Sequence, residues 1–200
     1  MGEALRTEAI ELVDDEGRVR ARLAAGDEGR VALELLDASG AVRLRLALGS
    51  DGAGRLEMRD PSGRPRAVLS SREETSLELR DPAGRQRVVL GEWPDDSTSL
   101  KLGDLDGVVR VAIGAWADLS AGVDVHDAQG RRRLSVVERE GGPAGVNVWD
   151  EAGHLRALLA VGPVPDREAS VEFWDADGAY RAGFGVWPEG DAGSAEIGDE

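Results

Sequence analysis

One short motif recurs eight times along the chain and limits what the sequence can fold into. Each aspartate is followed three residues later by glycine and six residues later by arginine, and all eight copies keep all three residues. Successive copies are 21 to 25 residues apart, a length that accommodates two short strands and their connections. The Asp-to-Gly segments are 14–17, 37–40, 60–63, 81–84, 104–107, 127–130, 150–153 and 175–178. We therefore expect residues 1–200 to form a single domain of eight repeats.

The residues that flank each motif alternate between apolar and polar. In the second repeat, Leu33, Glu34 and Leu35 precede the motif, and a second apolar series ends at Leu46 after it. A period of two residues is typical of a strand with one buried face. Two such strands on either side of a turn make a β-hairpin. The sequence thus predicts an all-β fold, an antiparallel meander of eight hairpins.

The turn residues also predict a register. Aspartate suits the first position of a type I turn, and Pro61 and Pro82 suit the second. With a two-residue loop between Asp and Gly, an acidic residue faces the motif arginine in six repeats, which favours that loop over a bulged one. The predicted pairs are Glu11–Arg20, Glu34–Arg43, Glu57–Arg66, Glu78–Arg87, Asp124–Arg133 and Glu172–Arg181.

Hairpins with one apolar face must stack or wrap to bury it. We expect a flattened shell, a sandwich or a hairpin solenoid, and the alternative is a four-bladed propeller with two repeats per blade. Residues 194–200 resemble the first strand of an unfinished ninth repeat. An odd number of strands prevents simple antiparallel closure, so we expect an edge that is open, capped or paired with another chain.

The pattern L-x-L-x-D-x-x-G-x-x-R-x-x-L resembles tandem hairpin repeats of uncharacterised bacterial proteins and is distantly similar to YD (RHS-type) repeats. That likeness spans nearly the whole chain and implies a hairpin at each motif. The tyrosine of YD repeats is replaced here, for example by Val13, Leu36 and Arg59. The shared motif is turn chemistry, so the resemblance implies no catalytic or binding residue.

Composition excludes several classes of function. The net charge of −15 disfavours binding to nucleic acid and to anionic membranes, because both need a basic surface. Cysteine is absent and only two histidines occur, which leaves no disulfide and no His-rich zinc site. The sequence also lacks a phosphate-binding loop and a nucleophile elbow. We expect no cofactor, and because residues 1–7 show no signal-peptide pattern, we expect a cytoplasmic location.

Two groups of residues are candidate binding sites. In the predicted register, His126, Trp149 and Trp174 form a stripe on the polar face, with His154 across from Trp149. Aromatic stripes of this kind bind partners or sugars, unless a loop or a chain terminus covers them. The second group is an arginine patch on the third and fourth repeats, suited to an acidic partner or an anion unless it is simply a solvated face. Its members are Arg59, Arg64, Arg66, Arg80, Arg85 and Arg87.

These observations favour a non-enzymatic scaffold that binds a protein or self-associates through an edge strand and the aromatic stripe. The alternative is a small-ligand or carbohydrate-binding protein, with calcium held in acidic loops such as 104–107 and 175–178, or a hydrolase that uses such loops. Neither loop has the ligand series of an EF-hand, and a solvated turn explains both.

Overall fold

The computed structural model describes residues 7–72, 74–162 and 169–186, and it divides into two compact units, Met1–Pro94 and Asp95–Glu200. Unit 1 holds the first four repeats and unit 2 the last four. The strands of unit 1 are β1 (Ala9–Val13), β2 (Val19–Ala25), β3 (Val31–Leu36), β4 (Val42–Leu48), β5 (Gly54–Arg59), β6 (Pro65–Ser71), β7 (Thr75–Arg80) and β8 (Gln86–Glu92). Those of unit 2 are β9 (Thr98–Gly103), β10 (Val109–Ala115), β11 (Ser120–His126), β12 (Arg132–Arg139), β13 (Ala144–Trp149), β14 (Leu155–Val161), β15 (Ala169–Trp174) and β16 (Tyr180–Val186).

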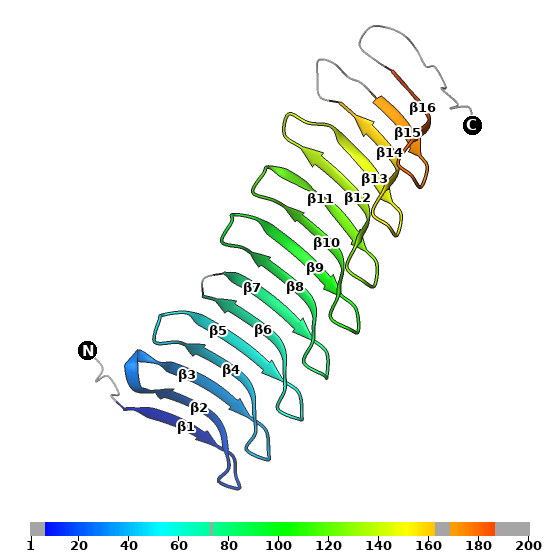
Figure 1. Cartoon of the computed structure of the whole chain (residues 1–200). Coiled ribbons are helices and arrows are strands. Elements are labelled where there is room, and N and C mark those ends of the chain that lie inside the picture. The colour runs from blue at the N-terminus through cyan, green and yellow to red at the C-terminus, as the bar shows by residue number, and fades with distance from the viewer. Residues whose placement is uncertain (1–6, 73, 163–168, 187–200) are drawn as a thin grey trace. The chain divides into compact units, whose positions relative to one another are not determined.

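Each unit is an antiparallel meander in which every strand pairs with its neighbours in the chain (Figure 1). The predicted all-β hairpin meander is confirmed. The propeller alternative is wrong within each unit, because β4 pairs with β5 and β12 pairs with β13 across what would be the gap between two blades. In both units the D-x-x-G turns line up along one side of the sheet and the other connections along the opposite side (Figure 1).

Helical structure is nearly absent from the described residues. The short 3-10 turn η1 (Asp27–Gly29) connects β2 to β3, and no described helix is long and apolar enough to cross a membrane. The predicted ninth repeat, 194–200, lies outside the described residues.

The D-x-x-G turn has a different geometry from the one the sequence predicted. In the second repeat, the Gly40 N–H donates to the Asp37 carbonyl at 3.0 Å, and the Asp37 N–H donates to the carbonyl of Ala41 at 3.0 Å. This is a three-residue loop, in which a type I turn ends on a glycine with positive φ. Gly40 has φ +83°, and all eight motif glycines lie in this left-handed region. Glycine recurs because L-residues with a side chain seldom adopt that conformation.

The loop shifts the register, and the six predicted acid–arginine pairs are wrong. Glu34 pairs across the hairpin with Arg45 instead of Arg43, because a second shift follows between Leu35 and Leu36. A shift of one residue would turn each side chain to the other face of the sheet, and the second shift turns it back. Apolar residues therefore still pair with apolar residues, and alternation alone could not distinguish the two registers.

The motif arginine instead connects one turn to the next. Arg133 Nε donates to the carbonyl of Trp149 at 2.9 Å, and its Nη1 lies 3.8 Å from the carboxylate of Asp127 in its own turn. Other repeats show the same arrangement, with Arg110 donating to His126 and Arg156 to Trp174. In these repeats the carbonyl acceptor is the residue before the next aspartate, whereas Arg43 donates to the carbonyl of the aspartate itself, Asp60. The arginine thus gives a hydrogen-bond donor to the backbone of the next hairpin and joins neighbouring repeats.

Removing this bridge should destabilise the fold. We expect Arg133→Ala to lower the free energy of unfolding by about 1–2 kcal/mol, since a charge-assisted hydrogen bond is lost and the Trp149 carbonyl loses its donor. Urea unfolding followed by circular dichroism measures the change. The matched control is Arg30→Ala, which removes only an exposed ion pair with Glu28 and should cost less than about 0.5 kcal/mol. Equal effects of the two substitutions would contradict the bridging role.

Candidate functional site

The middle of one face of each sheet consists of aliphatic and aromatic side chains, with polar residues such as Thr75, Glu92 and Glu138 at the strand ends away from the D-x-x-G turns. Directly paired residues share a face, so the pairing places one apolar residue from every strand in a continuous line, called here the central row. In unit 1 the central row is Ile10, Leu23, Leu33, Leu46, Leu56, Leu69, Leu77 and Leu90. In unit 2 it is Leu100, Ile113, Val123, Val136, Val146, Leu159, Val171 and Phe184.

A second apolar line, the turn-side row, runs beside the central row on the D-x-x-G side. In unit 1 it is Leu12, Ala21, Leu35, Leu44, Met58, Ala67, Leu79 and Val88. In unit 2 it is Leu102, Val111, Val125, Leu134, Val148, Ala157, Phe173 and Ala182. The two rows together are called the aliphatic face, and neither row contains a charged residue.

The aliphatic face is open to solvent. Leu46 is 50% exposed, Leu90 51% and Phe184 58%. No second layer of described residues covers the face within either unit. Solvent-exposed leucines are ordinary when scattered, but a contiguous apolar patch of this length marks an interaction surface.

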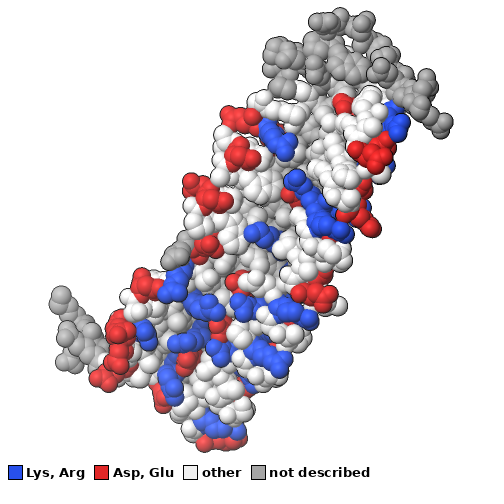
Figure 2. Space-filling view, viewed as in Figure 1, with Lys and Arg blue, Asp and Glu red and all other residues white. Residues whose placement is uncertain are grey.

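The opposite face is polar in unit 1. Glu11, Arg22, Glu34, Arg45 and Glu57 follow one another across β1 to β5 in alternating charge. Arg22 Nε donates to Glu11 at 2.8 Å, and Arg45 Nε lies 3.4 Å from Glu34. Basic and acidic side chains intermingle over unit 1 in the space-filling view (Figure 2).

Each unit buries one valine deeply, and both valines lie on this opposite face. Val68 is 1% exposed, between Glu57 and Glu78 in the register, and Val137 is 8% exposed in unit 2. Burial raises the pKa of the Glu57 carboxyl, but hydrogen bonds from Arg55 and Arg59 outweigh that effect and hold it below its usual value. The charged side chains therefore cover Val68 and neutralise one another, which describes a structural cluster.

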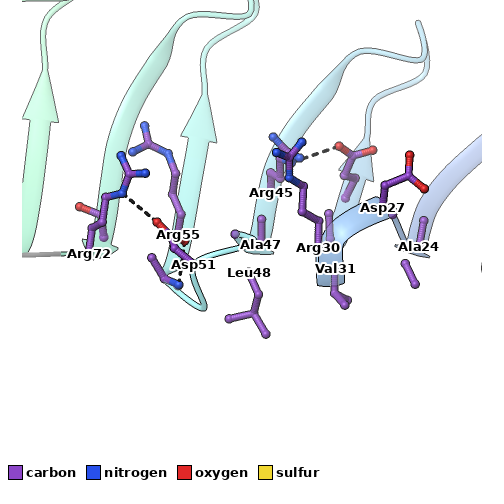
Figure 3. A pocket seen from close by; sticks show the side chains of 18 of the residues that line it. Ala24, Asp27, Arg30, Val31, Arg45, Ala47, Leu48, Asp51, Arg55 and Arg72 are labelled. Carbon is purple, nitrogen blue, oxygen red and sulfur yellow. Dashed lines mark hydrogen bonds and ion pairs between the residues drawn. The ribbon is translucent and has the colours of Figure 1, made fainter.

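A basin of about 680 Å³ lies on the polar face of unit 1, at the ends of the strands opposite the D-x-x-G turns (Figure 3). Arg45 and Arg55 point to one side of the sheet, whereas Val31 and Leu48 point to the other. The arginines of the basin already have acidic partners: Arg72 donates to Asp51 at 2.9 Å, and Arg55 donates to Glu57 at 3.0 Å. An incoming anion would have to displace these carboxylates.

The predicted aromatic stripe occupies the ends of alternate strands. His126, Trp149 and Trp174 are each half-buried, and their carbonyls accept the bridging arginines. The Arg132 guanidinium lies 4.6 Å from the centre of the Trp149 ring. Trp174 meets Tyr180 edge-on, with ring centres 6.1 Å apart. A binding role for the stripe stays a prediction.

The register moves the cross-strand partners of this stripe by one position. Trp149 pairs with Leu155 instead of His154, and His126 pairs with Arg132 instead of Arg131. His154 is exposed, with its Nδ1 3.6 Å from Asp150. His154 therefore belongs to the turn and does not face Trp149.

Arginines of the predicted patch bond to several different acceptors close to them. Arg59 donates to Glu57 at 2.6 Å, Arg80 to Glu78 at 2.9 Å and Arg85 to Asp81 at 2.9 Å. Arg64 and Arg66 donate to backbone carbonyls of the following repeat. Arg87 is on β8 and is half-buried. An acidic ligand at this patch stays a prediction, and it would compete with the local acceptors.

The aspartate oxygens of the acidic loops also have hydrogen-bond partners. Asp104 Oδ1 accepts the N–H groups of Asp106 and Val108, and Asp104 Oδ2 lies 3.4 Å from Arg110. Asp175 makes the same bonds to its own loop and to Arg181. Among the described residues no group of three or more His, Asp or Glu side chains is placed to hold a metal ion.

Sequence reasoning missed the aliphatic face as a site, because it assumed that the protein's own strands would bury it. The number and length of the repeats already indicated that the face could stay uncovered. Eight repeats of about 23 residues account for nearly all of these 200 residues, so almost no segment among them lies outside the hairpins to form a covering layer.

Comparisons with known proteins give distant likenesses. No protein-family model matches the sequence, and no curated protein matches it. One similar solved structure is the wild-type TCP10 domain of Danio rerio CPAP in complex with a peptide of Danio rerio STIL. It is 14% identical, with a TM-score of 0.41, over 95% of this chain and 99% of that chain. Another is the SAS-4 (dCPAP) TCP domain of Drosophila melanogaster in complex with a proline-rich motif of Ana2 (dSTIL), at 13% identity and a TM-score of 0.43, over 82% and 89%.

Proposed function

We propose that the chain is a non-enzymatic scaffold that binds a protein through its aliphatic face. The observation that carries the proposal is the pair of uncharged rows, which run across all strands of each unit and are exposed. Apolar surface of this extent is costly in water, and burial against a protein recovers about 25 cal/mol per Å². The polar face of unit 1 would gain less free energy from burial, because its charged groups already pair with one another.

The regular fold supports a scaffold over an enzyme. The aspartates of the D-x-x-G turns accept hydrogen bonds from their own loops, and Asp104, Asp150 and Asp175 also bond to the motif arginine. Catalytic carboxylates need room for a substrate or a water molecule beside them. The absence of an enzymatic role and the cytoplasmic location stay predictions.

Site-specific photo-crosslinking in cells that produce the chain tests the proposal. A photo-crosslinking amino acid at position 46 lies on the aliphatic face, and one at position 45 lies on the polar face of the same strand. A third position, 149, tests the aromatic stripe. We expect discrete protein adducts from position 46 and few from position 45. Adducts from positions 45 or 149 alone would place binding elsewhere and contradict the proposal.

A further inference from the structure

We infer that the aliphatic face is covered by the aliphatic face of a second copy of this chain, which gives a two-layered β-sandwich. This inference deepens the proposed function, because it names the partner of the same surface. Three observations support it: the relief of the face, its area and the distribution of charge.

The face is corrugated with a period of two strands. In the central row of unit 1 the residues of the even-numbered strands, Leu23, Leu46, Leu69 and Leu90, are 43–51% exposed. On the odd-numbered strands Leu33 and Leu56 are half-buried and Leu77 is 37% exposed, while Ile10 on the edge strand β1 is 42% exposed. Unit 2 repeats this relief with Ile113, Val136, Leu159 and Phe184. Strands lie about 4.8 Å apart, so the projections recur at about 9.6 Å.

The turn-side row has the same period displaced by one strand. Its exposed members in unit 1 lie on odd-numbered strands, Leu12, Leu35, Met58 and Leu79, and the half-buried residues Ala21, Leu44 and Ala67 lie between them. Projections therefore alternate with hollows in both directions. A surface of the same period, displaced by one strand, would place its projections in these hollows. A second copy of the chain has the same period, because it has the same sequence. In a dimer with two-fold symmetry, the same patch on each copy can bind its equivalent on the other.

The area is sufficient for a stable pair. Eight strands spaced about 4.8 Å apart, with about 13.6 Å of strand length under the two rows, present about 520 Å² in each unit and about 1,040 Å² in the two units together. Standard interfaces bury about 800 Å² on each partner. The rows of the two units together thus reach the standard size, and sheets that pack face to face across about 10 Å do so with interdigitated apolar side chains.

The charge distribution allows two acidic chains to meet on this face. The chain carries a net charge of −15, and a contact through most of its surface would bring like charges together. The two rows of the aliphatic face contain no charged residue, while Glu11, Glu34 and Glu57 occupy the opposite face with their arginines. Face-to-face association therefore keeps most carboxylates apart, across the thickness of both layers. Glu92 and Glu138 share the face of the two rows, but they lie at the strand ends opposite the D-x-x-G turns.

Sedimentation velocity of the full chain over a hundredfold range of concentration tests the inference. We expect a dimer that dissociates only on dilution. Leu46→Glu in unit 1 and Ile113→Glu in unit 2 each put a charge into the central row, and each should weaken dimerisation at least tenfold. The matched control is Ala47→Glu, which adds the same charge to the polar face, opposite Arg55 in the register, and should leave the dimer intact.

Circular dichroism melts establish that each variant is folded. Leu46→Ser is the milder substitution if Leu46→Glu does not fold, and it should still weaken the dimer severalfold. A chain that stays monomeric throughout the range, or a dimer that survives both glutamate substitutions, overturns the inference. If position 46 nevertheless crosslinks to a different protein, the inference fails while the proposed function stands. If position 46 crosslinks to nothing, both fail.

Discussion

Gly122→Ala should strongly destabilise unit 2, although it adds only one methyl group. Gly122 lies on β11, and a Cβ atom there would be 2.1 Å from the carbonyl oxygen of Val136 and 3.0 Å from the Cα of Val137. Both atoms belong to the backbone of β12, which cannot move without breaking the ladder. We expect a loss of about 3 kcal/mol, at the upper end of the cost of overpacking.

The same close approach recurs along one line of unit 2. A Cβ atom at Gly114, Gly145 or Gly185 would also lie within 2.6 Å of a carbonyl on the neighbouring strand. The matched control is Gly26→Ala, because a Cβ there meets nothing nearer than 3.8 Å and φ is −106°. The free energy of unfolding of this control, measured in urea, should differ from that of the wild type by less than about 0.5 kcal/mol. Equal stability of the two variants would show that β11 and β12 do not approach as described.

The second large effect is expected in acid, because the turn aspartates ionise more readily in the folded chain. For Asp14, the hydrogen bond from the Arg18 N–H is the main cause that lowers the pKa to about 2, although burial acts in the other direction. For Asp37, the Ser39 hydroxyl lowers the pKa furthest, with help from Arg43. The pKa values of five further turn aspartates are lowered as well, those of Asp81, Asp104, Asp127, Asp150 and Asp175.

A carboxyl whose pKa is lower in the folded state stabilises the fold above the unfolded value, near pH 4, and that stability is lost as the pH falls towards the folded value. We therefore expect the melting temperature to hold between pH 7 and about 5 and to fall steeply between about pH 4 and 2. Melts recorded by circular dichroism across this range measure it. The seven groups act together, so the decline should be larger than any one aspartate could produce.

Asp37→Asn is the control for that assignment. Asparagine keeps a side-chain oxygen that can accept the loop N–H groups, but it cannot ionise or pair with Arg43 as a charge. The variant should melt lower than the wild type at pH 7, and its melting temperature should fall less between pH 4 and 2. Parallel curves for the two proteins would mean that the turn aspartates do not carry the acid sensitivity.

The repeat and its strands could be predicted from the sequence because each hairpin carries its own local signals. Leu33, Glu34 and Leu35 alternate with the period of a strand, and the structure places them in β3 as expected. The turn positions follow from Asp37 and Gly40 for the same reason. The register did not follow, because a glycine with positive φ adds a loop residue and the bulge at Arg43 adds another. The two additions cancel in the apolar pattern, so only backbone geometry distinguishes them.

The role of the motif arginine and the exposure of the aliphatic face depend on relations between repeats. Arg133 bonds to a carbonyl 16 residues away, and no feature of one hairpin predicts that contact. Likewise, alternation identified Leu35 and Leu46 as residues that a folded protein should bury. It could not tell whether the covering layer comes from the same chain. Each unit is a single layer, so the surface predicted to be core became the candidate site.

Cysteine labelling in cells that produce the chain tests most directly whether the aliphatic face is covered. The chain has no cysteine of its own, so each single-cysteine variant reports one position. Leu69→Cys lies in the central row, and Ser62→Cys lies in an exposed turn, while urea-denatured samples correct for intrinsic reactivity. If a protein covers the aliphatic face, a maleimide should modify position 69 at least tenfold more slowly than position 62. Equal rates at the two positions would contradict the account, because they would leave the face as open in the cell as it is in the isolated chain.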